Sequence, residues 1–211
     1  MIQPQYNPVR RDFLRTCLLA GAALAVPRWL SGGLVSPLPV ESPLLDGLKF
    51  YPRSSWVAFA PRPALIKPAH VFTRLTVHHA GNSVNKHLRQ ADVVFDLNGI
   101  LEAHLQKNYG DIGYHFIIDY AGRIWEGRPL VYEGAHVSGM NEQNLGVMLL
   151  GNFEEQQPSA AQISALFLTV DALREKYPIS NDEIYGHCDL GQSACPGKRL
   201  YSPYVGELRQ L

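Results

Sequence analysis

The sequence predicts an α/β fold, a single domain in which about three helices flank a mixed central β-sheet. Two observations carry this prediction. Strand-like apolar runs alternate along the chain with segments of helical apolar spacing, which is typical of α/β domains. One pair of strand segments is joined only by a tight turn at Ala121-Gly122, which requires an antiparallel pair within the sheet. The 211 residues suffice for one such domain with a sizeable core plus an extra segment at one end.

Five segments have the length and composition of β-strands. Residues 74–79 (RLTVHH) predict a buried strand. Residues 114–119 and 124–127 flank the tight turn and predict a hairpin. Residues 145–151 (LGVMLLG) form a continuous apolar run, which suits a strand in the middle of a sheet. Residues 183–187 (EIYGH) predict a further strand.

Three segments predict helices. Between Asn85 and about Lys107 the apolar residues recur near helical spacing, at Leu88, Val93, Val94, Leu97, Ile100, Leu101 and Leu105. Residues 158–177 predict a second helix, which Ser159 caps and Pro178 ends. Residues 201–211 predict a short last helix.

The first 30 residues resemble a twin-arginine export signal of bacteria. Arg10 and Arg11 precede an uncharged apolar run at residues 17–26, which is shorter than the about 20 residues that a membrane-spanning helix needs. Ala23-Leu24-Ala25 forms a small-x-small site at which a signal peptidase could cut. The alternative is a solvated basic start on a buried helix. We expect the twin-arginine export machinery as a partner, no stable membrane span, and a periplasmic or cell-envelope location.

The segments after the signal define the domain boundaries. Residues 31–48 are rich in Gly, Pro, Ser and Leu without periodicity and predict a linker. Residues 50–63 contain two turn-forming regions around Trp56 and predict an arm that packs over the domain. We expect the domain to span residues 49–211 and to be a monomer.

The charge pattern excludes one class of partner. The chain has 19 basic and 19 acidic residues, and the basic residues are spread out rather than clustered. Such a distribution does not form a nucleic-acid surface, so we expect no nucleic-acid partner. Removal of residues 1–30 would take away four arginines and one aspartate and leave a mildly acidic protein.

The three cysteines have different expected roles. Cys17 lies in the apolar run of the signal and is a small apolar filler. In an oxidising periplasm Cys188 and Cys195 could form a disulfide. The alternative is that one of them is a metal ligand.

The strongest local signal for chemistry is YGHCDLGQSACPG, residues 185–197. It places His187 and Cys195 eight residues apart at the end of a predicted strand. One histidine of the His78-His79 pair would complete three ligands, the number that a catalytic zinc takes from protein while a fourth position stays open to water. Zinc lowers the pKa of such a water to about 7. We expect this zinc site at the strand ends, in a surface cleft, with Tyr114 placed to donate a hydrogen bond to the oxyanion.

These motifs resemble the type-2 N-acetylmuramoyl-L-alanine amidases, whose zinc fold is shared by peptidoglycan recognition proteins and certain phage lysozymes. The resemblance covers about three quarters of the chain in unbroken order. It runs through PRSSW (52–56), RLTVHHAG (74–81), DIGYHFIIDYAGRIWEGRP (111–129), GAHVSGMNEQNLGVMLLGNF (134–153) and GHCDLGQSACPG (186–197).

The resemblance implies a role for each matching residue. It assigns zinc to His78, His187 and Cys195, and the catalytic phenol to Tyr114. Members that have lost this cysteine tend to bind peptidoglycan without cutting it, so its presence favours an enzyme. The implied reaction is hydrolysis of the bond between N-acetylmuramic acid and L-alanine in peptidoglycan or muropeptides.

Two positions depart from the family pattern. Ser193 stands where active members usually carry Lys or Thr near the oxyanion; it could donate a hydroxyl hydrogen bond but no charge, so it is a weaker catalytic assistant. Met148 stands where another branch carries a catalytic Glu, so the tyrosine mechanism is the one that this sequence can run.

The resemblance also suggests two substrate-binding residues. His136 matches a segment that lines the family's substrate groove; the alternative is a role in stabilising a turn. Arg128 could hold a carboxylate of the peptide stem, and the alternative is an ordinary surface salt bridge. His79 should point away from His78 because successive side chains of a strand alternate. Solvated or helix-surface roles are expected for His70, His87 and His104.

Two other functions stay open at this point. A peptidoglycan-binding module without catalysis is supported only by Ser193. A redox protein that uses Cys188 and Cys195 is the weaker alternative.

Overall fold

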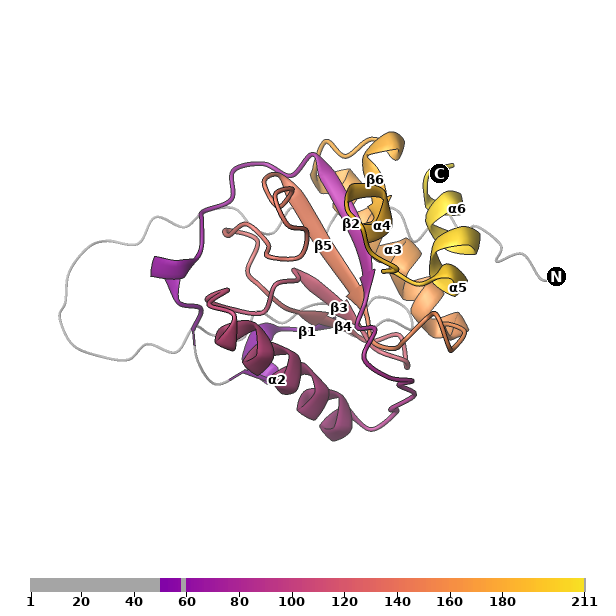
Figure 1. The fold of residues 1–211 in the computed structure, drawn as a ribbon, viewed down its shortest axis with the longest axis horizontal. Helices are drawn as coiled ribbons and strands as arrows, with labels where there is room; N and C mark the ends of the chain where they lie inside the picture. The colour runs from indigo at the N-terminus through magenta and orange to yellow at the C-terminus, as the bar shows by residue number, and fades with distance from the viewer. Residues whose placement is uncertain (1–49, 58–59, 211) are drawn as a thin grey trace.

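The computed structural model describes residues 50–57 and 60–210. The predicted export signal, residues 1–30, and linker, residues 31–48, lie outside the described residues. The described chain forms one six-stranded sheet with the strand order β1-β4-β3-β5-β2-β6 (Figure 1). The strands are β1 (Phe50–Tyr51), β2 (Arg74–His79), β3 (Phe116–Ile118), β4 (Ile124–Glu126), β5 (Asn144–Leu149) and β6 (Ile184–Gly186). Among these strands only β3 and β4 pair antiparallel, so the predicted mixed sheet and its hairpin are confirmed.

Helices cover both faces of the sheet (Figure 1). Helix α2 (Gln90–Gln106) lies on one face. Helix α3 (Ala160–Lys176) lies on the other, together with a C-terminal helical segment made of α5 (Lys198–Leu200), η4 (Tyr201–Val205) and α6 (Gly206–Leu208). The remaining short elements are η1 (Arg53–Ser55), η2 (Pro63–Leu65), η3 (Asn181–Glu183) and α4 (His187–Leu190). Within the described residues, none of these helices has the length and apolar character needed to cross a membrane.

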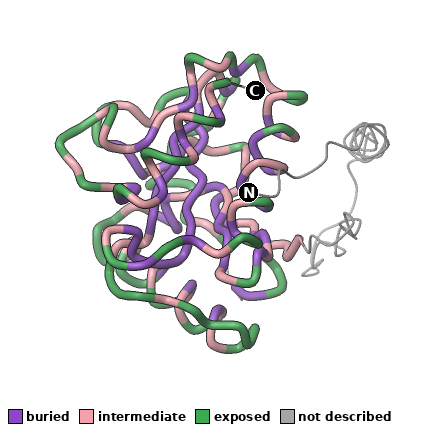
Figure 2. The backbone as a smooth tube through the Cα atoms, turned by 90° about the vertical axis from the view of Figure 1, so that its right-hand side faces the viewer, coloured by how far each residue is buried: buried purple, intermediate pink, exposed green. Residues whose placement is uncertain are grey.

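The sheet separates two apolar cores. On the α2 side, Val93, Leu97 and Leu101 pack in one cluster with Met148 of β5 and Trp125 of β4. On the α3 side, the other cluster contains these buried residues: Leu75, Val77, Leu145, Val147, Leu149, Leu166, Val170, Leu200 and Leu208. Figure 2 shows the buried backbone through the middle of the molecule, with exposed segments around it. Burial of apolar side chains on both faces is the main source of stability of this three-layer arrangement.

The second predicted helix and its cap are confirmed. The Ser159 hydroxyl accepts a hydrogen bond from the backbone N–H of Gln162, and the Gln162 side chain accepts one from the backbone N–H of Ser159. This capping box satisfies two amides at the start of α3, where a single cap contributes about 1 kcal/mol. Pro178 follows the last residues of the helix, as expected.

Two predicted helix boundaries and one strand differ from the structure. Helix α2 begins at Gln90 instead of Asn85, because the backbone of Asn85 is bound by the Gln156 side chain and does not enter the helix. The C-terminal helical segment begins at Lys198 instead of residue 201. The amino-terminal arm is confirmed, with Trp56 buried in it, and its first residues add strand β1 to the edge of the sheet beside β4.

Candidate metal centre

Three side chains from separate segments meet at one edge of the sheet. His78 lies near the end of β2, His187 opens α4 directly after β6, and Cys195 lies in the loop that follows α4. Their ligand atoms, two imidazole nitrogens and one thiol sulfur, all lie within 4.8 Å of one another. The three residues singled out as metal ligands in the sequence are therefore brought together.

The parallel pairing of β2 and β6 explains this meeting. Val77 pairs with Gly186, so His78 and His187 each follow by one residue at the same sheet edge, and their ring centroids lie 4.8 Å apart. The loop carrying Cys195 folds back, because the Cys188 N–H donates to the Cys195 carbonyl oxygen at 2.8 Å. The backbone N–H of His79 then donates to the Cys195 Sγ at 3.3 Å.

The donor set fits zinc. The Nδ1 atom of His78 lies 3.6 Å from the Sγ of Cys195. In tetrahedral zinc a nitrogen and a sulfur ligand lie roughly 3.5 Å apart, which follows from Zn–N of about 2.0 Å and Zn–S of about 2.3 Å. Two imidazoles and one thiolate also leave a fourth position for water or substrate, as in catalytic zinc sites.

Burial favours the neutral form of both histidines, the form that binds a metal ion. Burial lowers the pKa of His78 well below its ordinary value, and the neighbouring His136 and His187 lower it further. Burial likewise lowers the pKa of His187. Both rings are therefore neutral near pH 7 and have a bare nitrogen to offer a metal ion. In the metal-free protein burial raises the pKa of Cys195 to about 12, so a bound ion must displace the thiol proton.

Tyr114 lies beside the cluster. It precedes β3, and its ring centroid is 5.1 Å from that of His78. Burial raises the pKa of its phenol, and the nearby Cys195 raises it further. The phenol therefore keeps its proton at neutral pH and can act as a hydrogen-bond donor.

A cavity of about 520 Å³ opens next to the cluster. Its wall is formed by α2, the loop after β2 and the end of β5, and Tyr114 is the residue that it shares with the metal centre. The residues that line it are Ala80, Asn82, Ser83, Asn85, Phe95, Asp96, Gly99, Ile100, Ala103, His104, Lys107, Tyr114, Met148, Leu150 and Gly151.

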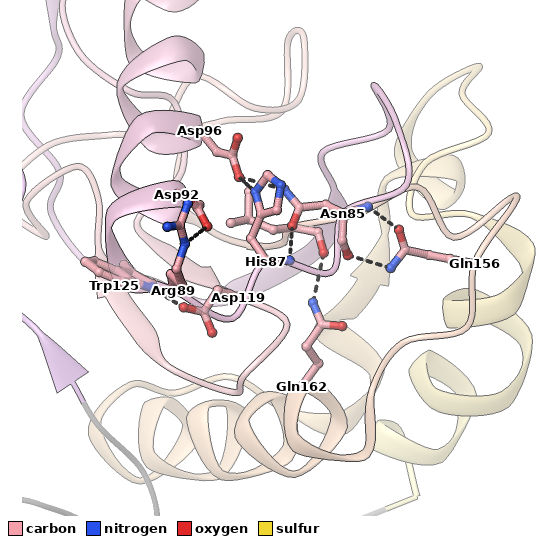
Figure 3. A network of polar contacts seen from close by, with 10 residues as sticks. Asn85, His87, Arg89, Asp92, Asp96, Asp119, Trp125, Gln156 and Gln162 are labelled. Atoms are coloured by element: carbon pink, nitrogen blue, oxygen red, sulfur yellow. Dashed lines mark hydrogen bonds and ion pairs between the residues drawn. The ribbon is translucent and has the colours of Figure 1, made fainter.

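The loop after β2 is fixed by a network of side chains (Figure 3). Gln156 accepts a hydrogen bond from the Asn85 N–H at 2.7 Å and donates one to the Asn85 carbonyl at 2.9 Å. The Asn85 side chain donates to Asp96 on α2, and His87 contacts the same carboxylate oxygen at 2.8 Å. The network ties one wall of the cavity to α2 and to the loop after β5.

His104 has a role that the sequence analysis missed. It lines the cavity from α2, its ring centroid is 5.6 Å from that of Tyr114, and its Nδ1 accepts the N–H of Gly113. Burial lowers its pKa to about 4, and Lys107 and Arg128 contribute to this lowering. The expected helix-surface role is therefore wrong. The missed signal is spacing, since His104 follows Leu97 by seven residues and lies on the same helix face.

The structure also corrects the expectation for Arg128. This residue is 2% exposed, and its guanidinium donates to the backbone carbonyls of Tyr109, Asp111, Ile112 and Glu133. These contacts hold together the loops around Tyr114. A bidentate contact with a substrate carboxylate is not available to a guanidinium occupied in this way, so Arg128 is a structural residue.

His136 is likewise engaged inside the protein. Its Nδ1 lies 3.0 Å from the Nε2 of His78, and its Nε2 lies 3.1 Å from the carbonyl oxygen of Asn144. Burial, followed by His115, lowers its pKa to about 3. The expected substrate contact is corrected, because neither ring nitrogen is left for a ligand.

The remaining expectations concern neighbours of the cluster. His79 points to the opposite face from His78, as the strand alternation predicts, and its Nδ1 accepts the N–H of Phe153. The Ser193 hydroxyl oxygen accepts the Cys195 N–H at 3.1 Å, which leaves its hydrogen available for donation. Cys188 and Cys195 are both free thiols, so the disulfide alternative is not what the structure adopts.

Comparison with known proteins agrees with this geometry. A family model described as N-acetylmuramoyl-L-alanine amidase (Amidase_2) matches residues 68–198. A peptidoglycan-recognition protein of Drosophila simulans is 32% identical over 153 residues, which cover 71% of this chain and 81% of that protein.

The solved structures that share the fold at more than 25% identity include an amidase and a recognition protein. N-acetylmuramoyl-L-alanine amidase LysC from Clostridium intestinale URNW has a TM-score of 0.62 and 26% identity, over 77% of this chain and 95% of its own. Peptidoglycan recognition protein LE, solved with tracheal cytotoxin, has a TM-score of 0.66 and 27% identity, over 77% of this chain and 93% of its own. The relatives thus include both an amidase and proteins named for recognition.

Proposed function

Because the chain belongs to the N-acetylmuramoyl-L-alanine amidase family, we propose that it is a zinc-dependent amidase that acts on peptidoglycan. The bond cleaved is the amide between the lactyl group of N-acetylmuramic acid and L-alanine. The observation that carries this proposal is the convergence of His78, His187 and Cys195 beside the Tyr114 phenol at the edge of a cavity. A binding module needs a cavity, but it does not need an open three-ligand metal site.

The residues of the chain have distinct parts in this reaction. His78, His187 and Cys195 would hold zinc, which when bound would supply a Lewis acid for the scissile carbonyl and lower the pKa of water to about 7. Tyr114 keeps its proton and donates a hydrogen bond to the carbonyl oxygen as negative charge develops there. Ser193 fixes the Cys195 backbone through its hydroxyl oxygen, and its hydroxyl hydrogen is a neutral donor for the same developing negative charge.

The cavity wall orients the substrate. Asn82 and Ser83 offer amide and hydroxyl groups from the loop after β2, and Lys107 offers a cation from α2. Such groups match the amides and carboxylates of a muropeptide stem. We extend the proposal to export by the twin-arginine route into the periplasm or cell envelope, on the basis of Arg10 and Arg11.

The competing function is peptidoglycan binding without cleavage, which the names of several relatives favour. A direct experiment separates the two. The purified protein is incubated with muropeptides and with whole sacculi, with chelator and after zinc is restored, and the products are read by mass spectrometry. We expect free stem peptides that begin with L-alanine, lost with chelator and regained with zinc. Peptidoglycan binding at full zinc occupancy without any stem release would refute the amidase proposal.

A further inference from the structure

The imidazole of His136 is held between a metal-cluster residue and the central strand. On one side its Nδ1 lies 3.0 Å from the Nε2 of His78. On the other side its Nε2 lies 3.1 Å from the carbonyl oxygen of Asn144, the first residue of β5. The ring thus bridges the backbone of β5 and the candidate ligand of the neighbouring strand.

Two glycines make room for this ring. A Cβ atom added to Gly134 would lie 2.3 Å from the Cδ2 of His136, and one added to Gly146 would lie 2.6 Å from it. Gly146 sits inside β5, where a glycine weakens a strand and leaves no side chain to pack. Its presence there is explained by the imidazole that occupies the space.

The loop that carries His136 is also tied in place. The Asn141 side-chain oxygen accepts the backbone N–H of His136 at 2.8 Å and that of Val137 at 2.9 Å. The Asn144 side chain donates to the Met140 carbonyl at 2.8 Å. The backbone of His136, the space around its Cδ2 and both of its ring nitrogens are therefore all constrained.

The hydrogen-bond partners determine which nitrogen carries a hydrogen in each ring. A carbonyl oxygen can only accept, so the Nε2 of His136 is its donor, and in the neutral ring Nδ1 is its acceptor. The Nε2 of His78 must then donate to that Nδ1. The bare nitrogen of His78 is consequently Nδ1, the atom that lies 3.6 Å from the Sγ of Cys195.

We propose that His136 is a positioning residue for the metal centre, which fixes the tautomer and the ring orientation of His78 so that Nδ1 faces the ion. This inference rests on the proposed zinc site but not on catalysis. Metal-bound histidines commonly donate their second ring N–H to a fixed acceptor, and loss of that acceptor typically lowers metal affinity 10- to 100-fold. Here the acceptor is another imidazole, itself fixed by the backbone of β5.

Zinc affinity of the full chain, measured by competition with a chromophoric chelator, tests the proposal. His136→Ala removes the acceptor, and we expect zinc binding about 10- to 100-fold weaker. His136→Asn places an amide oxygen where Nδ1 was, so its affinity should stay within severalfold of wild type. His115→Asn is the matched control, because His115 is also buried but bonds Gly146 and Tyr132 instead of His78. It should lose stability and keep the zinc affinity.

The tautomer of His78 in the metal-free protein gives a second, independent reading. Nitrogen-15 shifts should show the hydrogen on Nε2 in the wild type and a mixture of tautomers in His136→Ala. An Nδ1–H tautomer in the wild type, or unchanged zinc affinity in a folded His136→Ala, overturns the proposal. If His136→Ala does not fold, the tautomer of His78 in the wild type and the zinc affinity of His136→Asn test the proposal in its place. If the wild type bound no zinc, the proposed function would fail, while the tautomer would still decide the role of His136.

Discussion

The Sγ atom of Cys195 lies 3.6 Å from the Nδ1 atom of His78, although 117 residues separate the two along the chain. The contact depends on β2 and β6 being parallel neighbours, since that pairing brings the segment after β6 to the end of β2. It also depends on the His79 N–H, which binds the same sulfur. Cys195 is thus placed by the sheet itself, and its thiol is the natural point at which to test the metal centre.

Replacement of Cys195 should abolish both zinc binding and amidase activity. Cys195→Ala removes the only thiol among the three grouped ligands, and two histidines hold zinc far more weakly. We expect a loss of affinity greater than 100-fold and no muropeptide cleavage, measured by metal content and by product analysis. Cys188→Ala is the control, because Cys188 is a free thiol outside the ligand group. If the Cys195 variant cleaved at the wild-type rate, or if only the Cys188 variant lost activity, the ligand assignment would be wrong.

The Tyr114 phenol should affect turnover and leave the metal in place. In Tyr114→Phe the ring remains beside His78, but the hydrogen-bond donor to the developing oxyanion is lost. Loss of one such donor lowers kcat by about 10²- to 10³-fold. Steady-state kinetics on a muropeptide and zinc titration measure the two effects. Tyr120→Phe removes a phenol from the hairpin turn and should retain full activity; equal losses in both variants would contradict a specific role for Tyr114.

The parts of the site that lie on regular strands could be predicted from the sequence. The alternation of His78 and His79 followed from strand geometry alone, and β2 is extended as that reasoning requires. The burial of residues 145–151 followed from their unbroken apolar run, and all six residues of β5 are buried. These predictions hold because strand period and burial are local consequences of the sequence.

The roles that were mispredicted depend on contacts between loops. Arg128 binds four carbonyl oxygens of two loops, and carbonyl groups carry no side-chain signature that a sequence could reveal. His136 became a partner of His78 because Gly146 leaves a space in β5. That glycine looked like an ordinary member of an apolar run, so neither its purpose nor the position of the ring was visible before the fold was known.

The buried histidines should make stability depend on pH. Burial lowers the pKa of His115 to about 4, although its hydrogen bond to the Tyr132 carbonyl acts in the opposite direction, whereas the unfolded chain titrates near 6.5. Between these values the unfolded chain binds a proton that the folded protein does not. The histidine contribution to the free energy of unfolding should therefore be complete above pH 6.5. It should decrease as the pH drops toward 4, by up to about 1.4 kcal/mol per pH unit for each such histidine.

Urea unfolding at a series of pH values, with chelator present throughout, measures this dependence without a contribution from metal. His115→Asn should be less stable at pH 7, because it loses the buried contact between the His115 Nε2 and the Tyr132 carbonyl, even though its amide oxygen can still accept the Gly146 N–H. Its stability should also fall less steeply between pH 6.5 and 4. The remaining fall in the free energy of unfolding has a contribution from His136, whose ring lies edge-on to that of His115 and whose pKa is also low. Parallel curves for the two proteins would show that His115 does not titrate in this window.

The contact between Gln156 and Asn85 should control substrate affinity and not the chemical step. Asn85 and its neighbours Asn82 and Ser83 line the cavity, and Gln156 binds both the N–H and the carbonyl of Asn85 (Figure 3). In Gln156→Ala the loop loses both bonds, so part of its ordering must occur when the substrate binds. At about 1 kcal/mol net for these bonds, KM should rise roughly 5- to 10-fold.

Neither Gln156 nor Asn85 belongs to the metal centre, so kcat and zinc affinity should stay within about twofold of wild type. A tenfold change in either would require about 1.4 kcal/mol. Gln162→Ala is the matched control, because this glutamine is also buried but serves the start of α3 and the Leu150 carbonyl. It should lower the unfolding midpoint and leave KM near the wild-type value. A fall in kcat at constant KM in Gln156→Ala would place the loop in the chemical step instead. If the loop becomes ordered when the substrate binds, the free-energy cost of that ordering must raise KM.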